Sequence, residues 1–150
     1  HSLYPIIGVK NIGQGVPPSE KNARAEWGFR FSHEILRTGQ APALEKIVRD
    51  AGYGRPECTV LNYWKAGPAG APSVAVADPA VAWTAVWNPA TKRLTLAMVN
   101  WKSGPLKTTT AVLRSKKAAK SCADAETGKA HPAGEVSLDG WGVRILTYAF

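Results

Sequence analysis

The chain has 150 residues, the size of one ordinary domain, and its 45% hydrophobic and 20% charged residues are typical of a globular protein rather than a disordered one. Eleven prolines and 14 glycines predict many turns and favour β-structure over a helical bundle. The net charge of +8 is compatible with an anionic partner, whereas no apolar run approaches the roughly 18 residues of a membrane-spanning helix, so we expect no membrane association.

The first ten residues, HSLYPIIGVK, lack the basic region, the long apolar stretch and the cleavage site of a signal peptide. The only methionine is Met98, so no initiator residue is present. We therefore expect a processed or trimmed product, or a fragment of a longer protein.

The first 55 residues read as a strand, a loop and two helices. Ser19 is a good N-cap, because its hydroxyl can accept from the unpaired N–H groups of a first helical turn. Apolar residues recur every four positions after it, and Gly52 ends the second helix. The apolar stripe is Ala23, Trp27, Phe31 and Ile35. The predicted elements are a strand at 3–9, a Gly-rich loop at 10–18 and helices at 20–38 and 42–53.

From residue 56 onward the periodicity changes to two, which predicts five to seven antiparallel strands. A meander of this kind must cover one apolar face, so we expect a β-sandwich. The fold class is then mainly β, with a strand-helix-helix segment in front of the sandwich. The predicted strands are 58–64, 81–87, 94–101, 106–113 and two within 135–150, with a linker at 66–72 and a loop over the basic run 114–120.

The amino-acid sequences of two segments resemble the C-terminal end of a glycoside hydrolase that is built as a (β/α)8 barrel with an appended β-sandwich. One is AWTAVWNPATKRLTLAMVNWKSGPLKTTTAVL (82–113), which is similar to a hairpin of the appended domain. The other is DAETGKAHPAGEVSLDGWGVRILTYAF (124–150), which is similar to its last strands. Neither segment carries a catalytic motif.

This resemblance implies two parts: residues 1–55 as the end of a catalytic barrel, including its last β/α unit, and residues 56–150 as the sandwich. It implies a part of a carbohydrate-active enzyme that flanks or supports the barrel, without the catalytic carboxylates and inactive alone. The implied partners are an oligosaccharide or polysaccharide and the remainder of the barrel, and the implied location is secreted or periplasmic. The alternatives are a stand-alone sandwich that binds an anionic glycan and, third, a basic nucleic-acid-binding domain.

The residues themselves predict no catalytic, metal or cofactor site. Glycoside hydrolysis needs two carboxylates about 5 to 10 Å apart, and no acidic pair ends adjacent predicted strands. His33 and Glu34 resemble half of a metalloprotease motif, but Arg37 occupies the position of the second histidine. We therefore expect catalytic residues, metals and cofactors to be absent from this chain.

Candidate glycan contacts come from one loop and two tryptophans. If a barrel precedes the sandwich, the loop after its last strand faces the active-site mouth, which makes Lys10, Asn11 and Gln14 candidates. Of the six tryptophans, Trp101 and Trp141 are the best candidates for exposed rings that stack on a sugar. The main role that we expect for Trp101, however, is to cover the edge of the sandwich. The patterns place the side chains of Trp27, Trp83 and Trp87 inside.

Two cysteines, Cys58 and Cys122, are too few for a zinc cluster. We expect them to form a disulfide, and this bridge is the main argument for an exported protein. The alternative is a buried free thiol at Cys58 and an exposed Cys122 whose pKa is lowered by nearby lysines.

Overall fold

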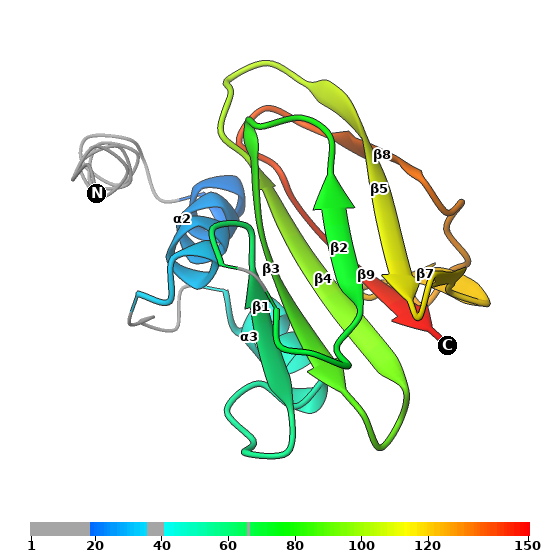
Figure 1. Cartoon of the computed structure of the whole chain (residues 1–150). Coiled ribbons are helices and arrows are strands. Elements are labelled where there is room, and N and C mark those ends of the chain that lie inside the picture. The colour runs from blue at the N-terminus through cyan, green and yellow to red at the C-terminus, as the bar shows by residue number, and fades with distance from the viewer. Residues whose placement is uncertain (1–18, 36–40, 66) are drawn as a thin grey trace.

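The computed structural model describes residues 19–35, 41–65 and 67–150. Within them, two helices are followed by nine strands in two antiparallel sheets (Figure 1). Among these residues no helix is both long and apolar enough to cross a membrane. The elements are α2 (Glu20–Ser32), α3 (Pro42–Asp50), β1 (Thr59–Asn62), β2 (Ser73–Val76), β3 (Val81–Asn88), β4 (Arg93–Asn100), β5 (Leu106–Arg114), β6 (Lys117–Ala118), β7 (Ser121–Asp124), β8 (Glu135–Leu138) and β9 (Val143–Ala149).

The larger sheet has the strand order β1-β3-β4-β9-β7, and the smaller sheet is built around the long strand β5, which pairs with β2, β6 and β8. The inner faces of the two sheets enclose one core. Leu94, Leu96 and Met98 alternate along β4 and are at most 1% exposed in this core. The predicted antiparallel sandwich is therefore confirmed.

The outer face of the larger sheet is covered by α2 and α3 (Figure 1). Trp27 and Phe31 of α2 pack with Ala97 of β4 in a second apolar cluster. A close approach is possible because α2 carries Gly28, where an added Cβ would lie 2.7 Å from a methyl carbon of Val143. Strand β4 is consequently buried on both faces.

The boundaries of the predicted elements agree with the structure in most places. Ser19 caps α2 by accepting from the amide of Asn22 at 3.1 Å, and Gly52, with φ of +110°, follows α3. Helix α2 ends at Ser32, earlier than the predicted residue 38, whereas the predicted strand 3–9 and loop 10–18 lie outside the described residues.

Three short strands are absent from the prediction. β2 and β7 are edge strands, where pairing with a neighbour rather than an alternating apolar pattern makes the strand. The basic run 114–120, predicted as a loop, forms the tight turn between β5 and β6. The reason is that Ser115 and Lys116 both adopt positive φ, at 50° and 63°, which is the backbone of a two-residue hairpin turn.

The predicted disulfide is wrong, because Cys58 and Cys122 are both free. Cys58 immediately precedes β1, and Cys122 lies in β7, at the opposite edge of the sheet. Four strand spacings separate these edges by about 19 Å, far beyond the roughly 7 Å between Cα atoms that a disulfide allows. The two side chains also belong to the clusters on opposite faces of the sheet.

The alternative of a reactive Cys122 is also wrong. Burial raises the pKa of the Cys122 thiol, and it raises that of Cys58 as well. Without a bridge, the cysteines no longer support an exported protein.

Candidate functional site

One end of the larger sheet is organised by Asn100, the last residue of β4. Its side chain is fully buried: Oδ1 accepts from the amide of Lys102 at 2.8 Å, and Nδ2 donates to the carbonyls of Gly104 and Asp139, both at 2.9 Å. The loop after β4 and the loop before β9 are thus tied to one side chain.

Trp101 follows Asn100 and turns toward α2. Its ring lies 4.8 Å from the ring of Phe29 and 5.2 Å from that of His33, between centroids. The side chain is partly buried, and its Nε1 is shielded from solvent without a hydrogen-bond partner among the described residues. Trp101 therefore fills the space between helix and sheet, rather than presenting a free ring face.

Trp141 lies in the second loop and is 36% exposed. Its backbone has φ of +55°, a left-handed conformation that bulky residues rarely adopt. The loop is clamped, because the amide of Trp141 donates to the carbonyl of Lys102 at 2.8 Å and that of Gly142 donates to Asp139 at 2.8 Å. At Gly140 an added Cβ would collide with the carbonyl of Ser103, so the two loops touch through glycine.

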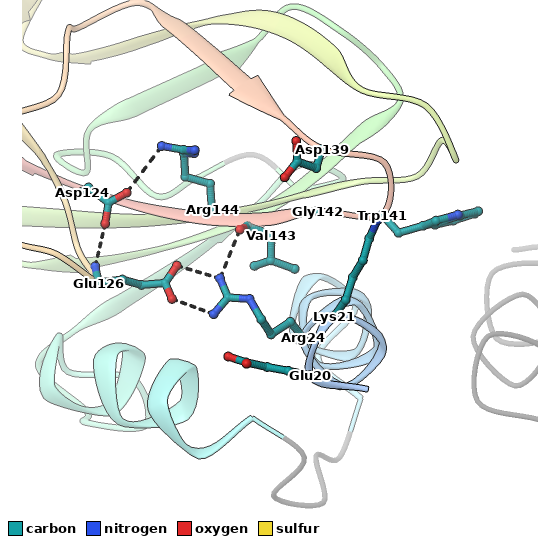
Figure 2. Close-up of a pocket in the computed structure, with 10 residues that line it drawn as sticks. All are labelled: Glu20, Lys21, Arg24, Asp124, Glu126, Asp139, Trp141, Gly142, Val143 and Arg144. Carbon is teal, nitrogen blue, oxygen red and sulfur yellow. Dashed lines mark hydrogen bonds and ion pairs between the residues drawn. The ribbon is translucent and has the colours of Figure 1, made fainter. Parts of the chain in front are cut away.

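A hollow of about 450 Å³ lies beside Trp141, between α2, the β7 turn and the start of β9 (Figure 2). Figure 2 shows the indole of Trp141 projecting outward at the rim, past Lys21. Charged side chains form most of the rest of the wall. They include Glu20, Lys21, Arg24, Glu126, Asp139 and Arg144.

The floor of this Trp141 hollow is an ion pair between α2 and the turn after β7. The two terminal nitrogens of Arg24 donate to the two carboxylate oxygens of Glu126 at 2.6 and 2.7 Å, and one also reaches the carbonyl of Val143 at 3.4 Å. The hydrogen bond and the charge of Glu126 raise the pKa of Arg24 above its usual value. The pair joins helix and turn, and it leaves Arg24 positively charged.

Asp124 organises the same turn. One carboxylate oxygen accepts from the amides of Glu126 and Thr127 at 2.9 and 3.0 Å, and the other lies 3.5 Å from Nη1 of Arg144. Asp124 and Glu126, the two carboxylates closest to one another along the turn, are thus both engaged in holding the structure. We assign neither an acid–base role.

The structure brings together some of the predicted site residues. Trp101 and Trp141 lie on loops that are hydrogen-bonded to one another, but only Trp141 borders a hollow with its ring exposed. Lys10, Asn11 and Gln14 lie outside the described residues. Among the described residues, no three His, Cys, Asp or Glu side chains are grouped so that they could hold a metal ion.

Sequence reasoning missed the charged wall, because Arg24 and Glu126 are 102 positions apart and neither belongs to a motif. It also missed a second aromatic hollow of about 440 Å³, where the exposed Tyr63 and Trp64 lie with Trp83. Trp64 is 47% exposed, and its Nε1 donates to the carbonyl of Ser32 at 3.2 Å. An Asn-Tyr-Trp sequence at a strand end was the only available indication.

Comparison with known proteins gives weak and partial similarities. No protein-family model and no curated protein matches the chain. Among solved structures, a catalytic mutant of Gan42B, a GH42 β-galactosidase from G. stearothermophilus, is 16% identical with a TM-score of 0.34, over 73% of this chain and 12% of that protein. The apo exo-carrageenase GH42 from Bacteroides ovatus is 15% identical with a TM-score of 0.33, over 77% of this chain and 16% of that protein. The chain therefore spans less than a fifth of either protein's length.

Proposed function

We propose that this chain is a non-catalytic β-sandwich part of a carbohydrate-active enzyme of the glycoside hydrolase class, and that it contacts glycan at the Trp141 hollow. The resemblance in sequence supports the class of protein. The confirmed sandwich and the chemistry of the hollow support the binding role.

One observation carries the proposal: an exposed tryptophan is held in a strained backbone. A left-handed conformation costs a residue with a Cβ about 1 to 2 kcal/mol, and such strain is concentrated at functional sites. Glycine or asparagine would adopt the φ of +55° at position 141 more easily. The outward-facing indole at the rim of the hollow gives tryptophan a use there that these residues lack (Figure 2).

The hollow suits the two kinds of surface that a sugar presents. The apolar C–H face of a pyranose packs on a flat aromatic ring, which Trp141 supplies at the rim. Sugar hydroxyls donate and accept hydrogen bonds, and Asp139 and Lys21, which line the same hollow, provide an acceptor and a donor. A few polar groups around an apolar contact are the usual composition of a small-ligand site.

Affinity gel electrophoresis in galactan, xylan, glucomannan and dextran tests this proposal. We expect at least one neutral polysaccharide to retard the wild-type chain, and the Trp141→Asn variant to lose at least about 90% of that retardation. Asparagine tolerates the left-handed backbone, so the relief of backbone strain offsets part of the stability that is lost with the indole, and the fold is retained.

The matched control is Trp64→Ala, which removes another exposed tryptophan at the second aromatic hollow. Retardation that persists in Trp141→Asn, or that is lost only in Trp64→Ala, would contradict the proposed site. Absence of retardation in all four polysaccharides would contradict the binding role.

The alternative, a stand-alone sandwich that binds an anionic glycan, differs from this proposal in what surrounds the chain. The open reading frame upstream of residue 1 separates them, because the proposal requires further β/α units there. A nucleic-acid-binding domain predicts instead that affinity for oligonucleotides is high and falls steeply with salt.

A further inference from the structure

A third hollow, of about 350 Å³, lies at the opposite end of β4 and β9 from Trp141. Its wall is basic. Lys92, Arg114, Lys117 and Lys120 line it together with Ser115 and Phe150, and no acidic side chain takes part. We refer to it as the basic hollow.

The topology brings together the turn at Lys92, the basic run 114–120 and the end of β9 at Phe150. Lys92 precedes β4, whose first residue Arg93 pairs with Ala149 of β9, and Ala149 pairs in turn with Ser121 of β7. The amide of Phe150 donates to the carbonyl of Lys92 at 3.0 Å, and that of Lys120 donates to Ala149 at 2.8 Å. The positions of the cations are thus fixed by backbone pairing.

The turn between β5 and β6 adds the other two cations. Arg114 and Lys117 are opposite one another as the closing pair of this turn. The guanidinium of Arg114 lies 5.0 Å from the ring centroid of Trp87, and Phe150 contacts the same ring edge-on at 5.8 Å. Trp87 is buried in the sandwich core, so Arg114 is anchored to the core.

None of these four cations takes part in an ion pair among the described residues. Seven ion pairs join basic and acidic side chains elsewhere among these residues. Like charges that are gathered without a counter-ion repel one another, and a bound anion relieves this repulsion.

Backbone strain is concentrated at the same place. Five non-glycine residues among those described have positive φ, and three of them, Lys92, Ser115 and Lys116, belong to the turns at the basic hollow. Such turn positions normally carry glycine or asparagine, and a lysine there costs about 1 to 2 kcal/mol. The cost is understandable where the side chains in these turns serve a ligand.

We propose that the basic hollow binds an anionic group, a sulfate ester or a carboxylate, of a glycan. This inference rests on the proposed glycan-binding function and adds a charged subsite to it. Arg114 supplies a planar pair of donors that suits an oxyanion, and Lys117 and Lys120 supply point charges in the same hollow.

A glycan is favoured over nucleic acid by the shape and the lining of the hollow. A nucleic-acid strand is followed by an extended basic groove with aromatic rings on which bases stack. Here the cations line one hollow, and the rings of Trp87 and Phe150 are packed against one another.

The test compares two variants of equal charge in affinity gels that contain dextran sulfate or neutral dextran. In Lys117→Gln/Lys120→Gln we expect at least a tenfold loss of affinity for dextran sulfate. The control Arg55→Gln/Lys129→Gln removes two exposed cations that line neither the Trp141 hollow nor the basic hollow, and it should stay within twofold of wild type. Equal losses in both variants, or none in either, would overturn the proposal.

Two further measurements identify the class of anionic ligand and distinguish the basic hollow from the Trp141 site. A single-stranded oligonucleotide that binds more tightly than dextran sulfate, and that is lost in Lys117→Gln/Lys120→Gln, would overturn the glycan as ligand. The Trp141→Asn variant should keep its affinity for dextran sulfate while losing that for neutral polysaccharide. If neutral binding is absent throughout but the sulfate-dependent loss is present, the Trp141 site fails and the basic hollow stands.

Discussion

Replacing Asn100 by alanine removes the side chain that ties together the two loops of the candidate site. The side chain makes three hydrogen bonds in a fully buried position, and its loss leaves the carbonyls of Gly104 and Asp139 and the amide of Lys102 without their partner. At about 1 kcal/mol for each bond, we expect the free energy of unfolding to fall by about 3 kcal/mol.

The matched control is Asn88→Ala, at the other end of the same hairpin. Asn88 is also buried, but its Oδ1 only accepts from the amides of Ala90 and Thr91, at 3.1 and 3.3 Å, in an exposed turn. Water can replace these bonds, so we expect a loss of about 1 kcal/mol.

Urea denaturation measures both losses, and hydrogen exchange of the Trp141 amide, which donates to Lys102, reports the state of the loops. We expect this amide to lose protection in Asn100→Ala well below the global unfolding free energy, and retardation by neutral polysaccharide to be lost with it. Equal destabilisation in the two variants, with the Trp141 amide still protected in Asn100→Ala, would refute the reasoning.

Three further experiments, two on variants and one on the unchanged chain, test the packing and the titrating groups. Gly28→Ala should destabilise by about 1 kcal/mol in urea, because the clash of a Cβ with Val143 exceeds the gain in helix propensity; a more stable variant would show that α2 can shift. Burial raises the pKa of Tyr148 to about 12, against about 10 in an unfolded chain. The contribution of the neutral phenol to the free energy of unfolding is therefore full below pH 10 and is lost as the pH rises toward 12. Tyr148→Phe should flatten this alkaline decline in stability, and an unchanged slope would contradict the assignment. Thiol titration should find two free thiols in the denatured, unreduced chain and slow reaction in the native one, since burial raises the pKa of Cys58 and Cys122, whereas no free thiol would restore the bridge.

Periodicity predicted the parts of the fold whose pattern is local. The alternation of Leu94, Leu96 and Met98 identified the core face of β4, and the cap at Ser19 identified the start of α2. The disulfide could not be judged in this way, because the strand order, which puts β1 and β7 at opposite edges, is set by pairing between distant segments.

The candidate site was predictable only in part for a similar reason. Trp141 stood out because it lies between two glycines, and close backbone contacts explain both: an added Cβ would collide with the carbonyl of Ser103 at Gly140 and lie 2.8 Å from the carbonyl oxygen of Asp139 at Gly142. The parity of Trp101 along its strand correctly set it apart from the core stripe of β4, but parity does not say what covers the other face. In the structure that face is covered by α2, whose Phe29 contacts the Trp101 ring.

The double burial of β4 bears on how the chain joins any larger enzyme. Val86, Ala97 and Ile145 face α2 and α3 and are at most 4% exposed, so the sandwich presents an apolar outer face that these helices cover. An exposed apolar sheet face of this size would be an aggregation hazard. The division at residue 55 therefore stays a prediction with a physical condition attached: a barrel that ends there must leave α2 and α3 packed on the sandwich. In that arrangement α2 and α3 form the interface between barrel and sandwich. The Trp141 hollow, whose wall includes Arg24 of α2, then lies at this interface.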